Sequence, residues 1–393
     1  MSDASRPKEP FTVRAARRAF IAAIRYANRR ADTFTTYHER PKFARRLGTW
    51  GESATAREPM AVAMQGPVAT QDDFTLETLK IYRAHMPECR LILSTWNDTP
   101  EAILAPMADL GVEIVLSEKP AHPGLQNVNM QIVSASNGVR RAIEGGAEWI
   151  LKTRTDQRLY DPNVMSFLIG TAKAFPVAGP AQKHRIVGVG HGSLKFAPYH
   201  VTDQTVFGHA EDMLVYWTPP LREDLPGSLP KGIATIYATV PVGKLCRHGA
   251  PESYFASEFL KRRGWTPVWT LEDTWAAYRD RFCFVDPAAT DFFWVKAQTH
   301  SLREQSFRYD IVSNRHEMGF RDWMLLYSRQ LGVEAARDYE VALDATFMVD
   351  PAAVSAGRAQ SSHGAEILPA ERIGLERGEA AGPVGASSVG RGS

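Results

Sequence analysis

The strongest constraint on the fold is an alternation of short apolar segments with longer amphipathic ones between residues 60 and 155. The apolar segments are five to seven residues long, and each is followed by polar or turn-forming residues. Helical stretches of roughly ten to fifteen residues separate them, an alternation typical of βαβ units and a largely parallel sheet. The predicted strands are 60–64, 90–96, 112–116 and 149–155, and the predicted helices are 74–85, 100–110 and a third that ends near 145–146.

The second half of the chain is less regular. Two further strands are predicted over 185–196 and 201–208, and Pro, Gly and aromatic residues are frequent from 215 to 300. From about residue 355 onward, large apolar residues become rare, which is typical of a disordered tail. We therefore expect a basic N-terminal extension over 1–57, one folded domain over 58–350 and a disordered tail over 351–393.

Basic charge is concentrated at the N-terminal end, although the net charge of the whole chain is only +2. Residues 11–31 have the periodicity of a helix, with Val13, Phe20, Ile24 and several alanines on one side and arginines on the other. A basic amphipathic helix can lie on an anionic membrane surface, or it can pack on its own domain with a solvated basic face. Both alternatives remain open. The arginines of the polar side are Arg14, Arg18, Arg25 and Arg29.

Composition narrows the class of protein. The hydrophobic share is 44 % and the charged share 23 %, which is ordinary for a globular protein. Cys89, Cys246 and Cys283 form no Cys-x-x-Cys pair, which disfavours a disulfide framework or a zinc ribbon. The sequence contains no run of eighteen apolar residues, so we expect no transmembrane helix. Its first residues do not resemble a secretory signal. We expect a cytoplasmic protein, peripheral at the inner membrane if residues 11–31 bind lipid, with no nucleic acid as partner.

Polar residues gather where the predicted strands end. In open parallel sheets, ligands bind at the carboxyl ends of the strands. The four predicted strands end in residues 65–67, residues 96–98, the loop after Leu116 and residues 154–156, and all of these are polar or turn-forming. A dinucleotide fingerprint and a Walker loop are both absent from the sequence, and the glycine-rich stretch 188–192 is expected to be a turn.

Several motifs occur in a fixed order along this region. They are Leu93-Ser-Thr-Trp-Asn-Asp98, Asn127-Val-Asn-Met-Gln-Ile-Val-Ser134 and Leu151-Lys-Thr-Arg-Thr-Asp156, followed by 203–208, 211–213 and 251–254. The ordered set resembles the WavE-type lipopolysaccharide synthesis family over about residues 58–300. That family is similar to glycosyltransferases of the GT-A fold. The resemblance implies an α/β, GT-A-like single domain that binds a nucleotide sugar, with a mostly parallel central sheet, helices on both faces and a less regular C-terminal half.

The implied activity is that of a glycosyltransferase, of hexosyltransferase type. Such an enzyme would move a sugar from a nucleotide diphosphate sugar to a glycan or glycolipid acceptor of lipopolysaccharide or capsule type. The departing diphosphate gathers negative charge, which the enzyme must stabilise. GT-A enzymes commonly do so with a divalent cation held by an Asp-x-Asp strand end, and Mg²⁺ and Mn²⁺ prefer carboxylate and phosphate oxygens.

This chain departs from that pattern, because Arg154-Thr155-Asp156 carries one carboxylate where two are usual. Period-two alternation predicts that Lys152, Arg154 and Asp156 lie on the same side of the strand. Two cations and one acid could bind a diphosphate directly. Alternatively, Asp156 is a metal ligand and a second acid, for example Asp161, joins it. The ordinary structural alternative is an ion pair between Arg154 and a neighbour.

Four further residues are candidates for contacts to the donor. Gln65 and Asp98 end the first two strands, where the base or ribose would lie, although both are equally well explained as satisfied loop residues. Asn129 and Gln131 open the helix before the fourth strand. Amides at a helix N-terminus can bind phosphate or sugar hydroxyls, and they can equally cap the helix.

Two acids are candidates for catalysis. A transfer that inverts the anomeric carbon needs a base for the acceptor hydroxyl. The resemblance implies an acid at the start of a late helix, and Glu252 occupies that place. Asp203, at the start of a predicted strand, could orient donor or acceptor. The ordinary role of Glu252 would be a favourable charge in the first turn of a helix.

Two other functions remain open at this point. A non-catalytic carbohydrate-binding or scaffold protein on a transferase-like fold is compatible with the single carboxylate of residues 154–156. A sugar nucleotidyltransferase would need a basic, glycine-rich loop after the first strand, and residues 65–71 contain no Lys or Arg.

Overall fold

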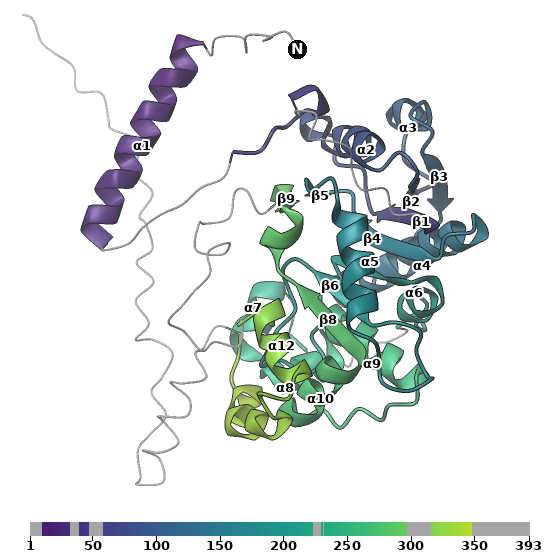
Figure 1. Ribbon diagram of the computed structural model, residues 1–393, viewed down its shortest axis with the longest axis vertical. Coiled ribbons are helices and arrows are strands. Elements are labelled where there is room, and N and C mark those ends of the chain that lie inside the picture. The colour runs from purple at the N-terminus through teal and green to yellow at the C-terminus, as the bar shows by residue number, and fades with distance from the viewer. Residues whose placement is uncertain are drawn as a thin grey trace, which may run out of the picture. The chain divides into compact units, whose positions relative to one another are not determined.

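The computed structural model describes residues 10–31, 39–46, 58–222, 229–230, 232–296 and 316–347 (Figure 1). The chain divides into two compact units, with the boundary between Thr49 and Trp50. The first unit contains helix α1 (Phe11–Ala31), whose bounds are those predicted from the sequence, and a short 3-10 turn (Ala44–Arg46). The predicted bounds of the extension and the domain stay predictions, and the predicted tail lies outside the described residues.

A seven-stranded sheet forms the centre of the second unit, with the strand order β3-β2-β1-β4-β7-β6-β8. Strand β7 is antiparallel to both of its neighbours, whereas all other neighbours in this sheet are parallel. The predicted α/β class with a mostly parallel central sheet is thereby confirmed. The strands are β1 (Met60–Gln65), β2 (Arg90–Trp96), β3 (Glu113–Ser117), β4 (Trp149–Arg154), β6 (Ile186–Val189), β7 (Thr205–His209) and β8 (Phe282–Val285).

Helices cover both faces of the sheet, as predicted (Figure 1). Helices α2 (Phe74–His85) and α3 (Glu101–Ala108) connect β1 to β2 and β2 to β3, and α4 (Val128–Glu144) leads back to β4. Because parallel crossovers are right-handed, the reversal of direction after β3 puts α4 on the face opposite α2 and α3. Helix α4 packs on β1 and β2 and against α6 (Ala210–Trp217). Both faces of β1 are therefore covered, and all six of its residues are buried.

The C-terminal half is built from short elements, as predicted. Aromatic side chains such as Trp275, Tyr278 and Trp323 are fully buried among them. A separate two-stranded sheet pairs β5 (Gln157–Leu159) with β9 (Phe292–Trp294). The remaining helices are α5 (Val164–Ala174), α7 (Ile233–Thr239), α8 (Val242–His248), α9 (Pro251–Arg262), α10 (Leu271–Arg281) and α12 (Phe320–Tyr327); the 3-10 segments are Gln71–Asp73, Leu125–Asn127, Pro287–Thr290 and Val333–Asp344.

The two strands predicted over 185–196 and 201–208 are too long. Strand β6 ends at Val189, because Gly190 and Gly192 take φ values of +90° and +97°, which an extended strand cannot hold. Strand β7 begins only at Thr205. The predicted turn is therefore found only in the C-terminal part of the stretch 188–192, because Gly188 lies inside β6.

No helix in the described part of the chain is both long enough and apolar enough to cross a membrane.

Candidate active site

The strand directions explain why distant segments meet at one edge of the sheet. Strands β1 and β4 are parallel and end together, with Gln65 paired in register to Arg154. Strand β7 runs the other way, with Val206 opposite Lys152, so its first residues lie at the edge where β4 ends. The residues before β7, Asp203 among them, are therefore brought to the carboxyl ends of β1 and β4.

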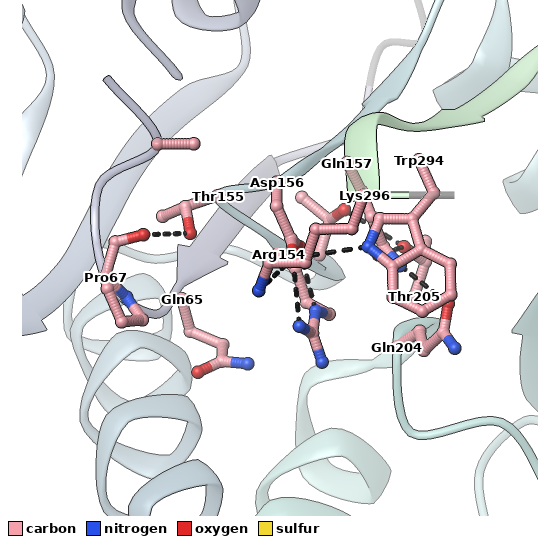
Figure 2. Close-up of polar contacts among 12 residues, drawn as sticks. Gln65, Pro67, Arg154, Thr155, Asp156, Gln157, Gln204, Thr205, Trp294 and Lys296 are labelled. Atoms are coloured by element: carbon pink, nitrogen blue, oxygen red, sulfur yellow. Dashed lines mark hydrogen bonds and ion pairs between the residues drawn. The ribbon is translucent and has the colours of Figure 1, made fainter. Parts of the chain in front are cut away.

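The loop after β1 is fastened to the end of β4 (Figure 2). The Thr155 hydroxyl donates to the carbonyl of Pro67 at 2.5 Å, and the Thr155 amide donates to the carbonyl of Gln65 at 3.1 Å. Gly66 turns the chain at φ +118°, and a Cβ there would lie 3.2 Å from the Thr155 hydroxyl. This close packing holds the two strand ends in a defined relation to each other.

A carboxylate surrounded by donors lies at the end of β4 (Figure 2). Arg154 donates to both oxygens of Asp156, from Nε at 2.9 Å and from Nη2 at 3.0 Å. The second oxygen also contacts the Lys296 ammonium at 2.9 Å and accepts from the Trp294 indole at 3.2 Å. Trp294 and Lys296 reach this place because β9 pairs with β5, with Trp294 opposite Gln157.

The charge state of this group follows from its neighbours. Burial by itself would raise the pKa of Asp156, but the hydrogen bonds and charges of Arg154 and Lys296 outweigh it and hold the pKa well below its usual range. Burial works against the charge of Arg154 too, and Asp156 again outweighs it, so the pKa of Arg154 is raised. Asp156 is therefore ionised at neutral pH, between two cations.

The spacing of Lys152 predicts that it lies with Arg154 and Asp156, but its ammonium binds the segment before β7 instead. Its fully buried ammonium donates to the backbone carbonyls of Asp203 at 2.6 Å and Gln204 at 3.2 Å, and it lies 4.2 Å from the centre of the Trp217 ring. Burial lowers its pKa to about 7. The Gln131 amide donates to the same Asp203 carbonyl at 2.7 Å. Lys152 and Gln131 thus hold the segment that precedes β7.

Glu252 lies in the first turn of α9, as predicted, beside a second acid. Burial and the charge of Asp203 raise the pKa of Glu252 to about 8. His200 lies with Nε2 3.7 Å from the Glu252 carboxylate, while its Nδ1 is 2.9 Å from the carbonyl of Gly192. The buried Tyr216 hydroxyl has no hydrogen-bond partner among the described residues, and burial, with the charges of Asp203 and Glu252, raises its pKa. The buried Asp203, His200 and Tyr216 and the partly buried Glu252 therefore share one environment.

The structure brings most of the predicted site residues to this edge, but not all of them. Gln65 is buried there and accepts a hydrogen bond from Ser134 at 2.7 Å. Asp98 is exposed and pairs with Lys119. The Asn129 amide bonds the backbone of His122 and Arg222, so its polar atoms hold loops together. The residues brought together are Gln65, Gln131, Lys152, Arg154, Asp156, Asp203 and Glu252.

Sequence reasoning did not find four residues of this neighbourhood: Trp294, Lys296, His200 and Tyr216. The first two arrive through the pairing of β5 with β9, which joins segments far apart in the chain. The aromatic run 292–294 indicates a short strand, but nothing in it names its partner. His200 is one of several scattered histidines, and Tyr216 has the helical spacing of a core residue.

The residues at the end of β4 do not fit a divalent cation. Both oxygens of Asp156 already accept hydrogen bonds, and two of its partners are cations that would repel a metal ion. In the part of the chain that the structure describes, no group of three or more His, Cys, Asp or Glu side chains could hold a metal. The alternative acid Asp161 accepts from the backbone amide of Asn163 in a local turn. The predicted metal role of Asp156 therefore finds no support in its surroundings.

Comparison with solved structures finds weak similarities. A glycosyltransferase involved in the glycosylation of the major capsid of PBCV-1 is 15 % identical, with 46 % of this chain and 76 % of that chain covered and a TM-score of 0.25. Mannose-1-phosphate geranyltransferase from Thermus thermophilus is 20 % identical, with 36 % of this chain covered and a TM-score of 0.24. This chain spans 44 % of that protein. A 4-diphosphocytidyl-2C-methyl-D-erythritol synthase is 16 % identical, with 42 % and 82 % covered and a TM-score of 0.28.

Comparison with curated proteins gives no match. The comparison with family models does give one, and it covers strands β1 to β7, whereas Glu252, Trp294 and Lys296 lie beyond its last residue. Residues 60–242 match the WavE family, described as lipopolysaccharide synthesis, which confirms for this part of the chain the resemblance that the ordered motifs indicate.

Proposed function

We propose that the protein is a glycosyltransferase that transfers a sugar from a nucleotide diphosphate sugar to a glycan acceptor of lipopolysaccharide or capsule type. The observation that carries the proposal is the meeting, at one sheet edge, of a partly exposed cationic group and a mostly buried acid of raised pKa. Arg154 and Lys296 supply the cations and Glu252 the acid. The family match over residues 60–242 supports the choice of lipopolysaccharide as acceptor class.

The donor diphosphate lies against the end of β4 in this proposal. Positive charge there stabilises the leaving group as the bond between the sugar and the diphosphate breaks. Gln65, at the end of β1, is near enough in register to Arg154 to contact the ribose or base. Asp98 and Asn129 remain more distant candidates for donor contacts, and the bonds that they make in the free protein would have to open.

Glu252 accepts the proton of the acceptor hydroxyl in a transfer that inverts the anomeric carbon. The acceptor oxygen forms the new bond to that carbon, its proton passes to Glu252, and the electrons of the broken bond stay on the diphosphate. A general base works best when its pKa lies near the pH of the reaction. The pKa of about 8 brings Glu252 close to neutral pH. Asp203, whose backbone Lys152 and Gln131 hold, is positioned beside Glu252 to orient the acceptor.

Helix α1 supports a second part of the proposal, a peripheral contact with an anionic membrane at which a lipid-linked acceptor is presented. The helix contains six arginines and no acidic residue. Its apolar side chains Val13 and Phe20 are 41 % and 48 % exposed. An exposed apolar face opposite a basic one is the pattern of helices that lie in a membrane interface.

The test is to incubate the protein with a panel of nucleotide diphosphate sugars and to measure release of free nucleoside diphosphate. A glycosyltransferase releases it from one donor family, and the Glu252→Gln variant binds that donor without releasing product. A nucleotidyltransferase would instead release pyrophosphate from a nucleoside triphosphate and a sugar phosphate. Binding of glycans without release of nucleoside diphosphate or pyrophosphate would indicate the non-catalytic alternative.

A further inference from the structure

We propose that this protein binds the diphosphate of its donor without a divalent cation, and that Arg154 and Lys296 take the place of the metal. The inference rests on the proposed function, because it concerns the same site. It adds Lys296, which comes from a distant part of the chain, to the residues that recognise a nucleoside diphosphate.

Four donors surround Asp156 unevenly. A carboxylate offers about four acceptor positions, two on each oxygen. Oδ2 is crowded by three donors, which are Arg154 Nη2 at 3.0 Å, the Lys296 ammonium at 2.9 Å and the Trp294 indole at 3.2 Å. Oδ1 accepts from Arg154 Nε, so a metal ion on this oxygen would lie directly beside the guanidinium, on a side chain that is only 5 % exposed.

The charges in direct contact with Asp156 also disfavour a metal ion. Asp156 is ionised and carries one negative charge, while Arg154 and Lys296 carry one positive charge each, so these three side chains sum to +1. Asp203 and Glu252 also act on Arg154, but they make no ion pair with it among the described residues. A divalent cation at Asp156 would be repelled by the two cations that touch it, whereas a diphosphate would be attracted to them. Asp156 then serves to fix the two cations in place.

Lys296 and Arg154 are both accessible to a ligand. The Lys296 side chain is 63 % exposed although its carboxylate partner is buried, and Arg154 is 27 % exposed. Arg154 uses Nε and Nη2 for Asp156, and a guanidinium carries five N–H donors in all. Lys152, by contrast, is fully buried and donates to backbone carbonyls, so it is no candidate for contact with phosphate.

The experiment is calorimetry of the full chain with pyrophosphate and with a panel of nucleoside diphosphates, each in EDTA and in Mn²⁺. We expect one base family to bind in EDTA with an affinity within about threefold of that in Mn²⁺. Lys296→Met should weaken binding in EDTA by about tenfold or more, since a hydrogen bond to a charged group is lost. Lys296→Arg should retain it.

The matched control is Lys173→Met, which removes an exposed lysine paired with Glu58 and should leave binding unchanged. Unfolding midpoints without ligand check that each variant is folded. Binding that needs Mn²⁺ would overturn the inference and leave the proposed function standing. Binding in neither EDTA nor Mn²⁺ would overturn both.

Discussion

At the scale of single residues, the mostly buried acid Glu252 makes stability depend on pH. Its pKa is raised from the ordinary 4.5 to about 8, so the folded state favours the protonated form. The free energy of unfolding of the wild type should therefore fall as the pH rises from about 4.5 through 8, relative to a variant without this acid. Asp203, Arg154, His200 and Tyr216 face the same group and are present in both proteins.

The prediction is that Glu252→Gln becomes increasingly more stable than the wild type between pH 4.5 and 8. The difference should reach several kcal/mol, since each pKa unit corresponds to about 1.4 kcal/mol. Thermal or denaturant unfolding of both proteins across this range measures it. A difference that stays constant with pH would show that Glu252 titrates at its ordinary pKa.

Asn129 offers a second test at this scale. Its amide donates to the carbonyls of His122 and Arg222 and accepts from the Arg222 amide at 2.8 Å. Asn129→Leu leaves these backbone groups without a side-chain partner and should cost about 1–3 kcal/mol of unfolding free energy. We expect donor affinity to change less than threefold. A loss of donor affinity without a loss of stability would instead favour the direct ligand contact that the position of Asn129 at a helix start suggests.

At the scale of elements, helix α1 should bind membranes through charge. Each arginine near an anionic surface contributes about 1 kcal/mol. The full chain should therefore sediment with vesicles that contain anionic lipid and remain in solution with neutral ones. Replacing Arg14, Arg18, Arg25 and Arg29 together by Gln should abolish the sedimentation. Equal binding to both kinds of vesicle, or none to either, would contradict this use of the helix.

The predictability of the elements differs along the chain for physical reasons. The bounds of α1, α2 and β2 could be predicted exactly, because turn residues or a change of periodicity mark their ends. The end of β6 and the start of β7 could not, since only the glycine conformations at 190 and 192 reveal the turn that ends β6. Strand ends identified Arg154 and Asp156, whereas Lys296 depends on a pairing of β5 with β9 that no local pattern encodes.

At the scale of the whole molecule, the function proposed here depends on one reversal of strand direction. A parallel sheet was predictable from the alternation of strands and helices, but the antiparallel β7 was not. Its direction brings Asp203 to the end of β4, where Lys152 and Gln131 hold its carbonyl at 2.6 and 2.7 Å. The contribution of α9 to the same edge is likewise a property of the complete fold, because Glu252 meets Asp203 only through tertiary packing.

The most direct test of the central claim is thermal unfolding of the wild type and of Arg154→Met with a panel of nucleotide diphosphate sugars. Ligand at a hundred times its Kd adds about 2.7 kcal/mol of stability to a protein that binds it only when folded. The account predicts that one base family raises the midpoint of the wild type by several degrees and leaves that of Arg154→Met unchanged. An equal shift in both proteins, or no shift with any nucleotide sugar, would contradict the assignment of this sheet edge as the donor site.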